Sequence, residues 1–237
     1  MRKIRYGMLA LVLLVSFLHL CSARAEAPRK LTLMVYMCGS NLESGYGSAS
    51  ADLEEMLASG FDSEQVSLLV MTGGAEGWVL GFDPANLTIN EIGRRGVRAV
   101  WREEAASMGV PETLTTLLNF GVERFPAEDY ALILWNHGGG PMEGVCRDEL
   151  FSMDNLSLSE LTQALEASNL PGKLSWIGFD ACLMSSAEVA STLAPYADYM
   201  IASQETEPAP GWNYAFLKGL ESDASAADTG RRIVDAY

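Results

Sequence analysis

The polarity pattern of this chain alternates between two kinds of segment. Short apolar runs rich in branched and aromatic residues are typical of buried strands, and the stretches between them carry apolar residues at helical spacing. A helix between two strands indicates that the strands run parallel. We predict strands at 31–37, 66–71, 130–135, 174–179 and 199–203, and helices at 49–59, 111–125, 159–167 and 183–193. This order predicts an α/β fold with a mostly parallel sheet and helices on both faces.

Three segments depart from the alternation. Residues 72–100 are rich in glycine and carry two short alternating runs, at 87–92 and 97–101, which predict a small antiparallel excursion. The stretch Cys146 to Leu156 is polar and has no periodicity, so we expect a loop there. Residues 231–237 have the pattern of the first turns of another helix, with no stop signal. We therefore expect the domain to be incomplete at its C-terminal end.

The first 25 residues, 1–25, have the pattern of a secretory signal peptide. Three basic residues precede an apolar stretch at 8–20, and Ala23-Arg24-Ala25 supplies a small-x-small cleavage pattern, so we expect export and a mature start at Glu26. Lipidation of Cys21 is an alternative, although Leu20 is bulkier than the residue that normally precedes a lipid-bearing cysteine. The apolar stretch is shorter than the about 20 residues that span a bilayer, so we expect no membrane association unless Cys21 is lipidated.

The remaining chain, 26–237, is long enough for one α/β domain. The full sequence has 31 acidic and 16 basic residues and a net charge of −15, and four of the basic residues lie in the signal segment. Such a surface repels nucleic acid and anionic membranes and attracts cationic ligands. Most of the acids are expected only to keep an exported protein soluble.

Cysteine and histidine usage narrows the chemistry. The three cysteines beyond the signal segment, Cys38, Cys146 and Cys182, have neither metal-site nor disulfide-framework spacing, and their odd number leaves at least one free thiol. A single histidine beyond the signal segment and the lack of a Cys-x-x-Cys pair argue against zinc. The chain also lacks a phosphate-binding Gly-x-x-x-x-Gly-Lys-Ser/Thr loop and a Gly-x-Ser-x-Gly elbow. Nucleotide enzymes and common serine hydrolases are therefore disfavoured, and we expect no metal or cofactor to be required for the chemistry.

Two strand ends carry the candidate chemistry. Asn136-His137-Gly138-Gly139-Gly140 follows the strand at 130–135, and Asp180-Ala181-Cys182 follows the strand at 174–179. Open α/β sheets bind their ligands at the carboxyl ends of their strands. A single cysteine and a single histidine so placed indicate a nucleophile with its base. The alternative is structural, because a cysteine after a core strand is usually a small buried side chain and a lone histidine usually a core or capping residue.

Each residue has an expected role in this chemistry. We predict Cys182 in the first turn of the helix at 183–193, where the helix dipole favours thiolate, with Asp180 as a cap of that helix. His137 would act as general base and then as acid to the leaving amine. The backbone amides of Gly138 and Cys182 would stabilise the oxyanion.

These residues resemble the active-site blocks of the clostripain-like cysteine peptidases. The likeness rests on Asn136-His137-Gly138-Gly139-Gly140 and Phe179-Asp180-Ala181-Cys182-Leu183-Met184, with weaker support along nearly all of 26–237. The resemblance implies a caspase-like three-layer αβα sandwich, a Cys/His dyad with no obligatory third member, and cleavage of protein or peptide substrates after Arg or Lys. It also implies a bacterial protein that is secreted or held in the cell envelope.

The resemblance also bears on specificity. Family members place acids in the pocket for the basic side chain, and Asp180 matches one of them. The second acid is expected in the loop after the strand at 199–203, where either Glu205 or Glu207 fits. A solvated loop glutamate is the alternative for both.

Self-processing and calcium are further properties of the family. Members tend to cleave themselves between the two blocks, where Arg147 is the only basic residue of the expected loop. Some respond to calcium, and Ca²⁺ is possible here, but Asp148, Glu149 and Asp154 show no EF-hand spacing. Besides a cysteine endopeptidase, two functions stay open: an inactive or truncated exported binding protein with this fold, and a hydrolase of another bond.

Overall fold

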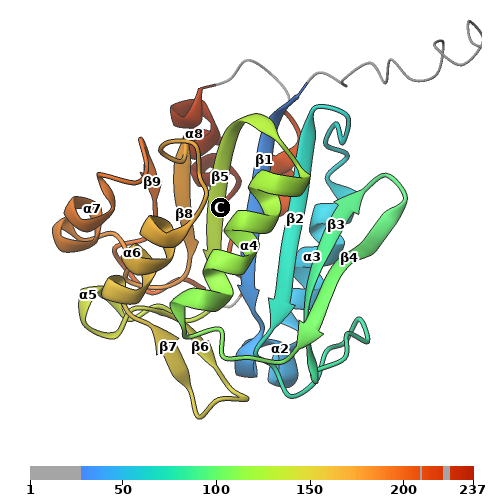
Figure 1. Cartoon of the computed structure of the whole chain (residues 1–237), viewed down its shortest axis with the longest axis vertical. Coiled ribbons are helices and arrows are strands. Elements are labelled where there is room, and N and C mark those ends of the chain that lie inside the picture. The colour runs from blue at the N-terminus through green and yellow to red at the C-terminus, as the bar shows by residue number, and fades with distance from the viewer. Residues whose placement is uncertain (1–27, 209, 221–224) are drawn as a thin grey trace, which may run out of the picture.

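One seven-stranded sheet organises the molecule, with the strand order β4-β3-β2-β1-β5-β8-β9 (Figure 1). The computed structural model describes residues 28–208, 210–220 and 225–237, so the expected signal peptide at 1–25 and Cys21 lie outside the described residues. The strands of this sheet are β1 (Arg29–Cys38), β2 (Val66–Gly73), β3 (Asn86–Gly93), β4 (Gly96–Glu104), β5 (Ala127–Trp135), β8 (Trp176–Asp180) and β9 (Met200–Ile201). A separate hairpin consists of β6 (Val145–Asp148) and β7 (Asp154–Leu156).

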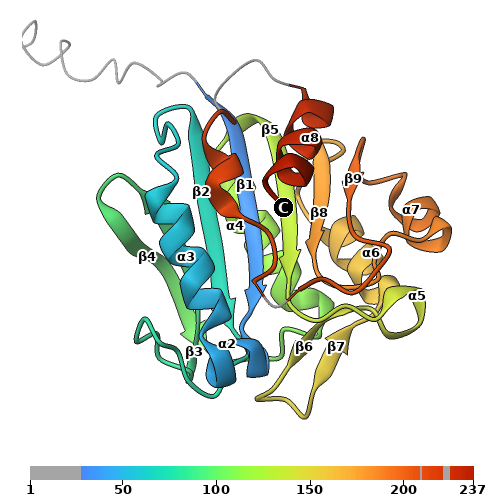
Figure 2. The ribbon, with the colours of Figure 1, turned by 180° about the vertical axis from the view of Figure 1, so that it is seen from behind.

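Helices cover both faces of the sheet, which confirms the predicted α/β sandwich. They are α2 (Ser40–Tyr46), α3 (Ser48–Ala58), α4 (Pro111–Arg124), α5 (Gly140–Glu143), α6 (Leu158–Ala167), α7 (Ala187–Leu193), the 3-10 helix η1 (Tyr214–Leu217) and α8 (Ala226–Ala236). Figure 1 shows α4 and α6 on one face, and Figure 2 shows α3 and α8 on the other. No helix in the described part of the chain is both long and apolar enough to cross a membrane.

The sheet is parallel from β2 through β1, β5 and β8 to β9, as the alternation of helices and strands predicted. The two alternating runs in the glycine-rich segment form β3 and β4, which pair antiparallel with β2 and with each other. The predicted antiparallel excursion is therefore confirmed, and it extends the main sheet at one edge. Since β1, β2, β5 and β8 all run the same way, their carboxyl ends and the loops that follow share one edge of the sheet.

Strand β1 shows how the two layers of core are divided. Successive side chains of a strand point to opposite faces, and both sets are fully buried here. Met34 and Tyr36 pack with the residues of α4 and α6, whereas Leu33 and Val35 pack with those of α3, η1 and α8. A strand buried on both faces reads as a continuous apolar run, which is why the sequence pattern identified it.

Two predictions about local structure are wrong. The expected loop at 146–156 is the hairpin of β6 and β7, which is held in place by Asp148: its buried carboxylate accepts hydrogen bonds from the amides of Met108 (2.8 Å) and Leu150 (2.9 Å). Its strands are too short to show a period. The helix expected from Leu183 begins only at Ala187, because Leu183 has a left-handed backbone (φ 64°) that interrupts any helix.

Candidate active site

The loops that carry His137 and Cys182 leave neighbouring strands at the same level. In the parallel pairing of β5 with β8, Trp135 lies opposite Asp180, and His137 and Cys182 each follow two residues later. The backbone at Gly138 lies against the Cys182 loop so closely that a Cβ atom there would come within 2.1 Å of the Cys182 carbonyl oxygen. Only glycine fits at that contact. The structure therefore brings together the two sequence-predicted blocks.

The backbone around His137 is held by its neighbours on β1 and β6. The side-chain amide of Asn136 donates to the Cys38 carbonyl oxygen (2.7 Å), and its Oδ1 accepts from the Arg147 amide (2.9 Å). The His137 carbonyl accepts from the Cys146 amide (3.2 Å), and the Gly139 amide donates to the Gly144 carbonyl (2.9 Å). Because those ladder bonds use His137 and Gly139, the amide of Gly138 between them takes no part in the ladder to β6.

The imidazole of His137 is half-buried and has a defined polar contact. Its Nε2 lies 2.8 Å from Oδ1 of Asn41, which belongs to α2. Burial, and then the positive charge of Arg147, lower the pKa of His137. A lowered pKa keeps the imidazole neutral near pH 7, and the neutral ring is the form that accepts a proton.

Cys182 lies in a turn between β8 and α7 and is partly accessible. The prediction that it lies in the first turn of a helix is wrong, since α7 begins at Ala187 with Ser186 as its N-cap. The segment that follows β9 runs beside this turn: Leu183 donates its amide to the Glu205 carbonyl (3.1 Å). The amide of Glu207 donates to Sγ of Cys182 (3.2 Å). This amide, and not a helix N-terminus, is the dipole that faces the sulfur.

Asp180 is the last residue of β8 and is not the cap of a helix. Its carboxylate is buried and accepts from the Trp212 amide (3.1 Å) and from the Tyr214 hydroxyl (2.9 Å). Burial raises the pKa of Asp180 to about 6, although the hydrogen bond from Tyr214 lowers it. The carboxylate therefore fixes the loop that leads into η1 and places a negative charge behind the Cys182 turn.

A pocket of about 180 Å³ is formed by residues of β9, the following loop and α8. Glu207 and Trp212 line it, and Trp212 Nε1 donates to Oε1 of Glu207 (3.3 Å). The other carboxylate oxygen of Glu207 is buried and has no hydrogen-bond partner among the described residues. Burial, and then the charge of Asp180, raise the pKa of Glu207 to about 8. Of the two candidate acids, Glu207 lines this pocket and Glu205 has an exposed side chain.

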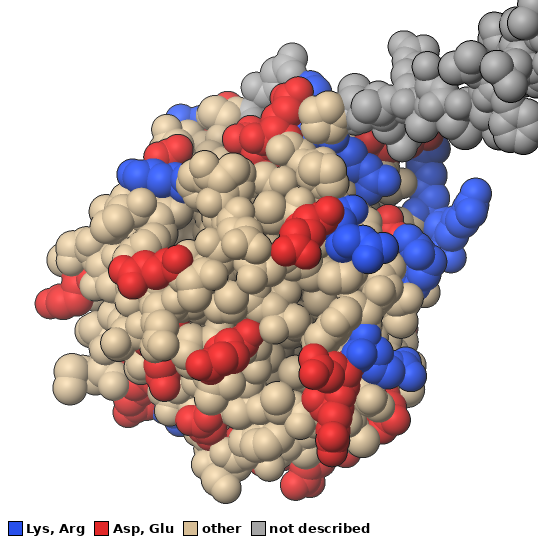
Figure 3. All heavy atoms as spheres, viewed as in Figure 1, with Lys and Arg blue, Asp and Glu red and all other residues tan. Residues whose placement is uncertain are grey.

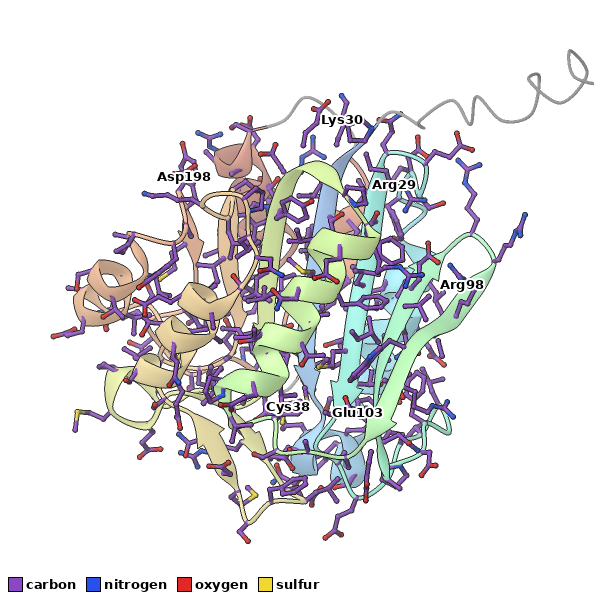
Figure 4. All side chains as sticks on the ribbon, viewed as in Figure 1. Arg29, Lys30, Cys38, Arg98, Glu103 and Asp198 are labelled. Atoms are coloured by element: carbon purple, nitrogen blue, oxygen red, sulfur yellow. The ribbon has the colours of Figure 1, made fainter. Side chains whose placement is uncertain are left out.

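The other two cysteines are remote from solvent. Cys38 and Cys146 are fully buried free thiols, and burial raises the pKa of both. Figure 4 labels Cys38 at the end of β1, where the chain turns into α2. Since only a thiolate on an accessible cysteine can attack a substrate, Cys182 is the thiol of the described chain that can serve as a nucleophile.

Arg147 lies in β6, and its guanidinium pairs with the Glu143 carboxylate. Its peptide is part of a strand, whereas the sequence indicated an exposed loop. Among the described residues, no group of three or more His, Cys, Asp or Glu side chains is arranged to hold a metal ion.

Asn41 is the site residue that the sequence reasoning missed. The sequence contained the signal, because Gly39-Ser40-Asn41 directly follows β1, and β1 pairs with β5. The argument from strand ends that led to His137 applies equally to this turn.

The chain is similar to known proteins over most of its length. A model described as the clostripain family matches residues 35–237. Clostripain of Hathewaya histolytica is 28% identical over 221 residues, which cover 78% of this chain and 41% of that protein.

Two solved structures share the fold. One is a secreted C11 cysteine protease from Bacteroides thetaiotaomicron in complex with an irreversible peptide inhibitor, with a TM-score of 0.73 and 23% identity over 88% of this chain and 59% of that chain. The other is an inactive zymogen C11 protease from Parabacteroides distasonis, with a TM-score of 0.63 and 24% identity over 89% of this chain and 57% of that chain. This chain thus spans between 41% and 59% of the length of these relatives. Since the family match extends over most of the sequence, the chain belongs to the clostripain family, the C11 cysteine peptidases.

Proposed function

We propose that the chain is an exported cysteine endopeptidase that uses Cys182 as nucleophile and His137 as general base. The observation that carries this proposal is the contact between the two strand-end loops, which places the accessible thiol of Cys182 and a neutral imidazole at one edge of the sheet. Export is supported by the signal pattern at 1–25 and by the description of the Bacteroides thetaiotaomicron relative as secreted.

The proposed reaction uses protein groups and water. His137 accepts the proton of the Cys182 thiol, and the sulfur attacks the carbonyl carbon of the scissile peptide. The negative charge that develops on the carbonyl oxygen is stabilised by the amides of Gly138 and Cys182. His137 then gives its proton to the leaving amine, and it activates the water that hydrolyses the thioester.

We propose substrates with Arg or Lys before the scissile bond. The pocket is lined by Glu207, whose amide donates to Sγ of Cys182. One oxygen of the Glu207 carboxylate is buried without a hydrogen-bond partner among the described residues, and the charge of Asp180 acts on this carboxylate. A guanidinium or ammonium group would supply the hydrogen bonds and the positive charge that this oxygen lacks. Asp180 is already bound to Trp212 and Tyr214, so it contributes chiefly by holding the pocket wall and by its charge.

The surface charge of the protein also favours a substrate with basic side chains. Figure 3 shows acidic side chains spread over one face, with most of its basic side chains gathered toward the side of the sheet where β4 lies. The net charge of −15 favours cationic peptide segments over nucleic acid or anionic membrane.

Peptide reporters with Arg, Lys or Asp before the cleaved bond test the proposal. The parent should cleave the Arg and Lys reporters, an alkylating agent should abolish the activity, and intact mass should show one alkyl group on Cys182 while the buried Cys38 and Cys146 stay unmodified. Cys182→Ala should be inactive and unmodified, and His137→Ala should lose about 100-fold or more in kcat. Activity in Cys182→Ala equal to that of the parent would contradict the proposal. A folded parent that cleaves none of the reporters would favour an inactive binding protein.

A further inference from the structure

Asn41 follows the strand β1, which neighbours the strand β5 that leads to His137. In the parallel pairing of β1 with β5, Met37 lies opposite Trp135, so the chain segments beyond these two residues leave the same edge side by side. Figure 4 marks this edge by Cys38, and Figure 2 shows α2 following it directly. Asn41 and His137 therefore meet although they are 96 residues apart in the sequence.

The turn that presents Asn41 is fixed by backbone hydrogen bonds. The amide of Gly39 donates to the Gly73 carbonyl (2.8 Å), and that of Ser40 donates to the Gly74 carbonyl (3.0 Å). Ser40 has a left-handed backbone (φ 50°), which is uncommon for a residue other than glycine and persists only where the surroundings impose it. The Asn136 amide that donates to Cys38 ties the residue before His137 to the same turn. The same set of hydrogen bonds therefore fixes the backbone that carries Asn41 and the backbone that carries His137.

The hydrogen bonds of the Asn41 amide indicate which ring nitrogen of His137 carries the proton. Oδ1 of Asn41 lies 2.8 Å from His137 Nε2 and also accepts from the Ser40 hydroxyl (3.4 Å). An amide oxygen can only accept, so Nε2 must donate. In a neutral imidazole the other nitrogen, Nδ1, then holds the free lone pair.

We propose that Asn41 is a positioning residue for the peptidase reaction. It holds His137 in the tautomer that is protonated at Nε2 and leaves Nδ1 to accept the proton of Cys182. The inference rests on the proposed function and extends it, since the resemblance to the family implied a dyad with no obligatory third member. The Cys182 proton moves to Nδ1, the resulting imidazolium keeps its Nε2 hydrogen on Asn41, and the Nδ1 proton later passes to the leaving amine.

Three variants and one control test the role of Asn41. Asn41→Ala removes the acceptor, Asn41→Asp keeps an acceptor and adds a charge, and Asn41→Leu removes the polarity at similar volume. Ser44→Ala is the matched control, because Ser44 lies on the same helix and its hydroxyl bonds Glu149 (2.7 Å) and not the imidazole. The readouts are kcat and KM on the Arg reporter, the pH profile of kcat/KM, and the rate of alkylation of Cys182 against pH.

We expect Asn41→Ala and Asn41→Leu to lower kcat by about 10- to 100-fold with KM changed less than about twofold. Asn41→Asp should recover most of this loss and shift the acidic limb of both pH profiles upward, because a carboxylate stabilises the imidazolium. The charged and titratable groups around His137 are Arg147 from β6, its ion-pair partner Glu143 from α5, and the Cys182 thiol; burial and then Arg147 lower the pKa of His137 in the parent. Ser44→Ala should match the parent.

Other outcomes overturn the inference. If Asn41→Ala keeps the kcat and the pH profiles of the parent, Asn41 does not position the imidazole. If Asn41→Asp falls as far as Asn41→Ala and its acidic limb does not move, the contact is merely structural. Neither result touches the proposed function, which fails if Cys182→Ala or His137→Ala retains the activity of the parent, or if the folded parent cleaves none of the reporters.

Discussion

Gly138 shows how a single residue decides whether the loops that carry His137 and Cys182 can come into contact. A Cβ atom at Gly138 would lie 2.1 Å from the Cys182 carbonyl oxygen, so Gly138→Ala must push the loops apart. Since a displacement of about 1 Å at a reacting centre costs about 100-fold in rate, we expect at least this loss of kcat/KM on the Arg reporter. Gly172→Ala is the control, because nothing lies within 4 Å of a Cβ there. Equal activity in the two variants would show that the loops do not need this contact.

Glu207 allows a residue-scale prediction about pH. Burial and the charge of Asp180 raise its pKa to about 8, so near pH 7 the empty pocket holds its proton. A bound cation favours the ionised form, and cation binding therefore releases a proton and strengthens as the pH rises. KM for the Arg reporter should fall between pH 6 and pH 9. Glu207→Gln should remove this trend and raise KM at pH 8.5 about 10- to 100-fold.

A matched variant distinguishes the effect of the acid in the pocket on KM from an effect of changing any acid in the same loop. Glu205→Gln changes an exposed side chain two residues away and should leave KM and its pH dependence unchanged. A neutral reporter should respond little to either substitution. If Glu205→Gln raises KM and Glu207→Gln does not, the second acid of the pocket has been misassigned.

At the scale of elements, the main sheet and the helices α3, α4 and α6 could be predicted, whereas the hairpin of β6 and β7 and the start of α7 could not. Apolar runs identified β1, β2, β5 and β8 because strands buried on both faces carry a continuous signal. Strand ends then led to His137 and Cys182, whose loops come into contact at Gly138. The strands β6 and β7 are too short to show a period. Their hairpin is held instead by Asp148, which accepts a hydrogen bond from the amide of Met108 in a distant loop. The turn after β1 offered the same strand-end signal for Asn41, but only the contact with His137, 96 residues away, identifies Asn41 as its partner.

The hairpin of β6 and β7 bears on self-processing at Arg147, which stays a prediction. The Arg147 amide is bound by Asn136, and its carbonyl accepts from the Cys38 thiol (3.3 Å), so cleavage there requires the hairpin to open. Gly109→Ala should promote opening, because a Cβ atom there would lie 2.7 Å from the backbone of Asn155. We expect the fragment that ends at Arg147 to form about tenfold faster, which corresponds to about 1.4 kcal/mol in the opening equilibrium.

Intact-mass analysis over time would measure this fragment. Cys182→Ala in the Gly109→Ala background should produce none, and this control separates self-cleavage from a contaminating protease. Gly172→Ala should behave as the parent does. A fully active chain in which Gly109→Ala yields no fragment would remove Arg147 as a processing site and leave the peptidase assignment intact.

At the scale of the whole molecule, the edge that carries the site holds several buried acids. Asp52 on α3 is 4% exposed and accepts a hydrogen bond from Trp135 Nε1 (2.6 Å), at the end of the strand that leads to His137. Burial, and then the charge of Asp180, raise the pKa of Asp52 to about 9. Ionising Asp52 in the folded chain therefore costs folding stability.

The cost has a defined pH dependence. The folded chain keeps the Asp52 proton up to about pH 9, whereas the unfolded chain releases it near its ordinary pKa of about 4. The free energy of unfolding therefore falls as the pH rises across this window. Asp52→Asn keeps an acceptor for Trp135 and removes the titration, so it should raise Tm at pH 8 by about 2 °C or more and change it little near pH 4. Asp235→Asn, at an exposed position of α8, should leave Tm unchanged at both pH values. Thermal unfolding of the parent, Asp52→Asn and Asp235→Asn tests this prediction. A drop in Tm at pH 8 for Asp52→Asn would mean that the ionised carboxylate stabilises this edge. The acids behind the loops that carry His137 and Cys182 would then serve the fold as well as the substrate.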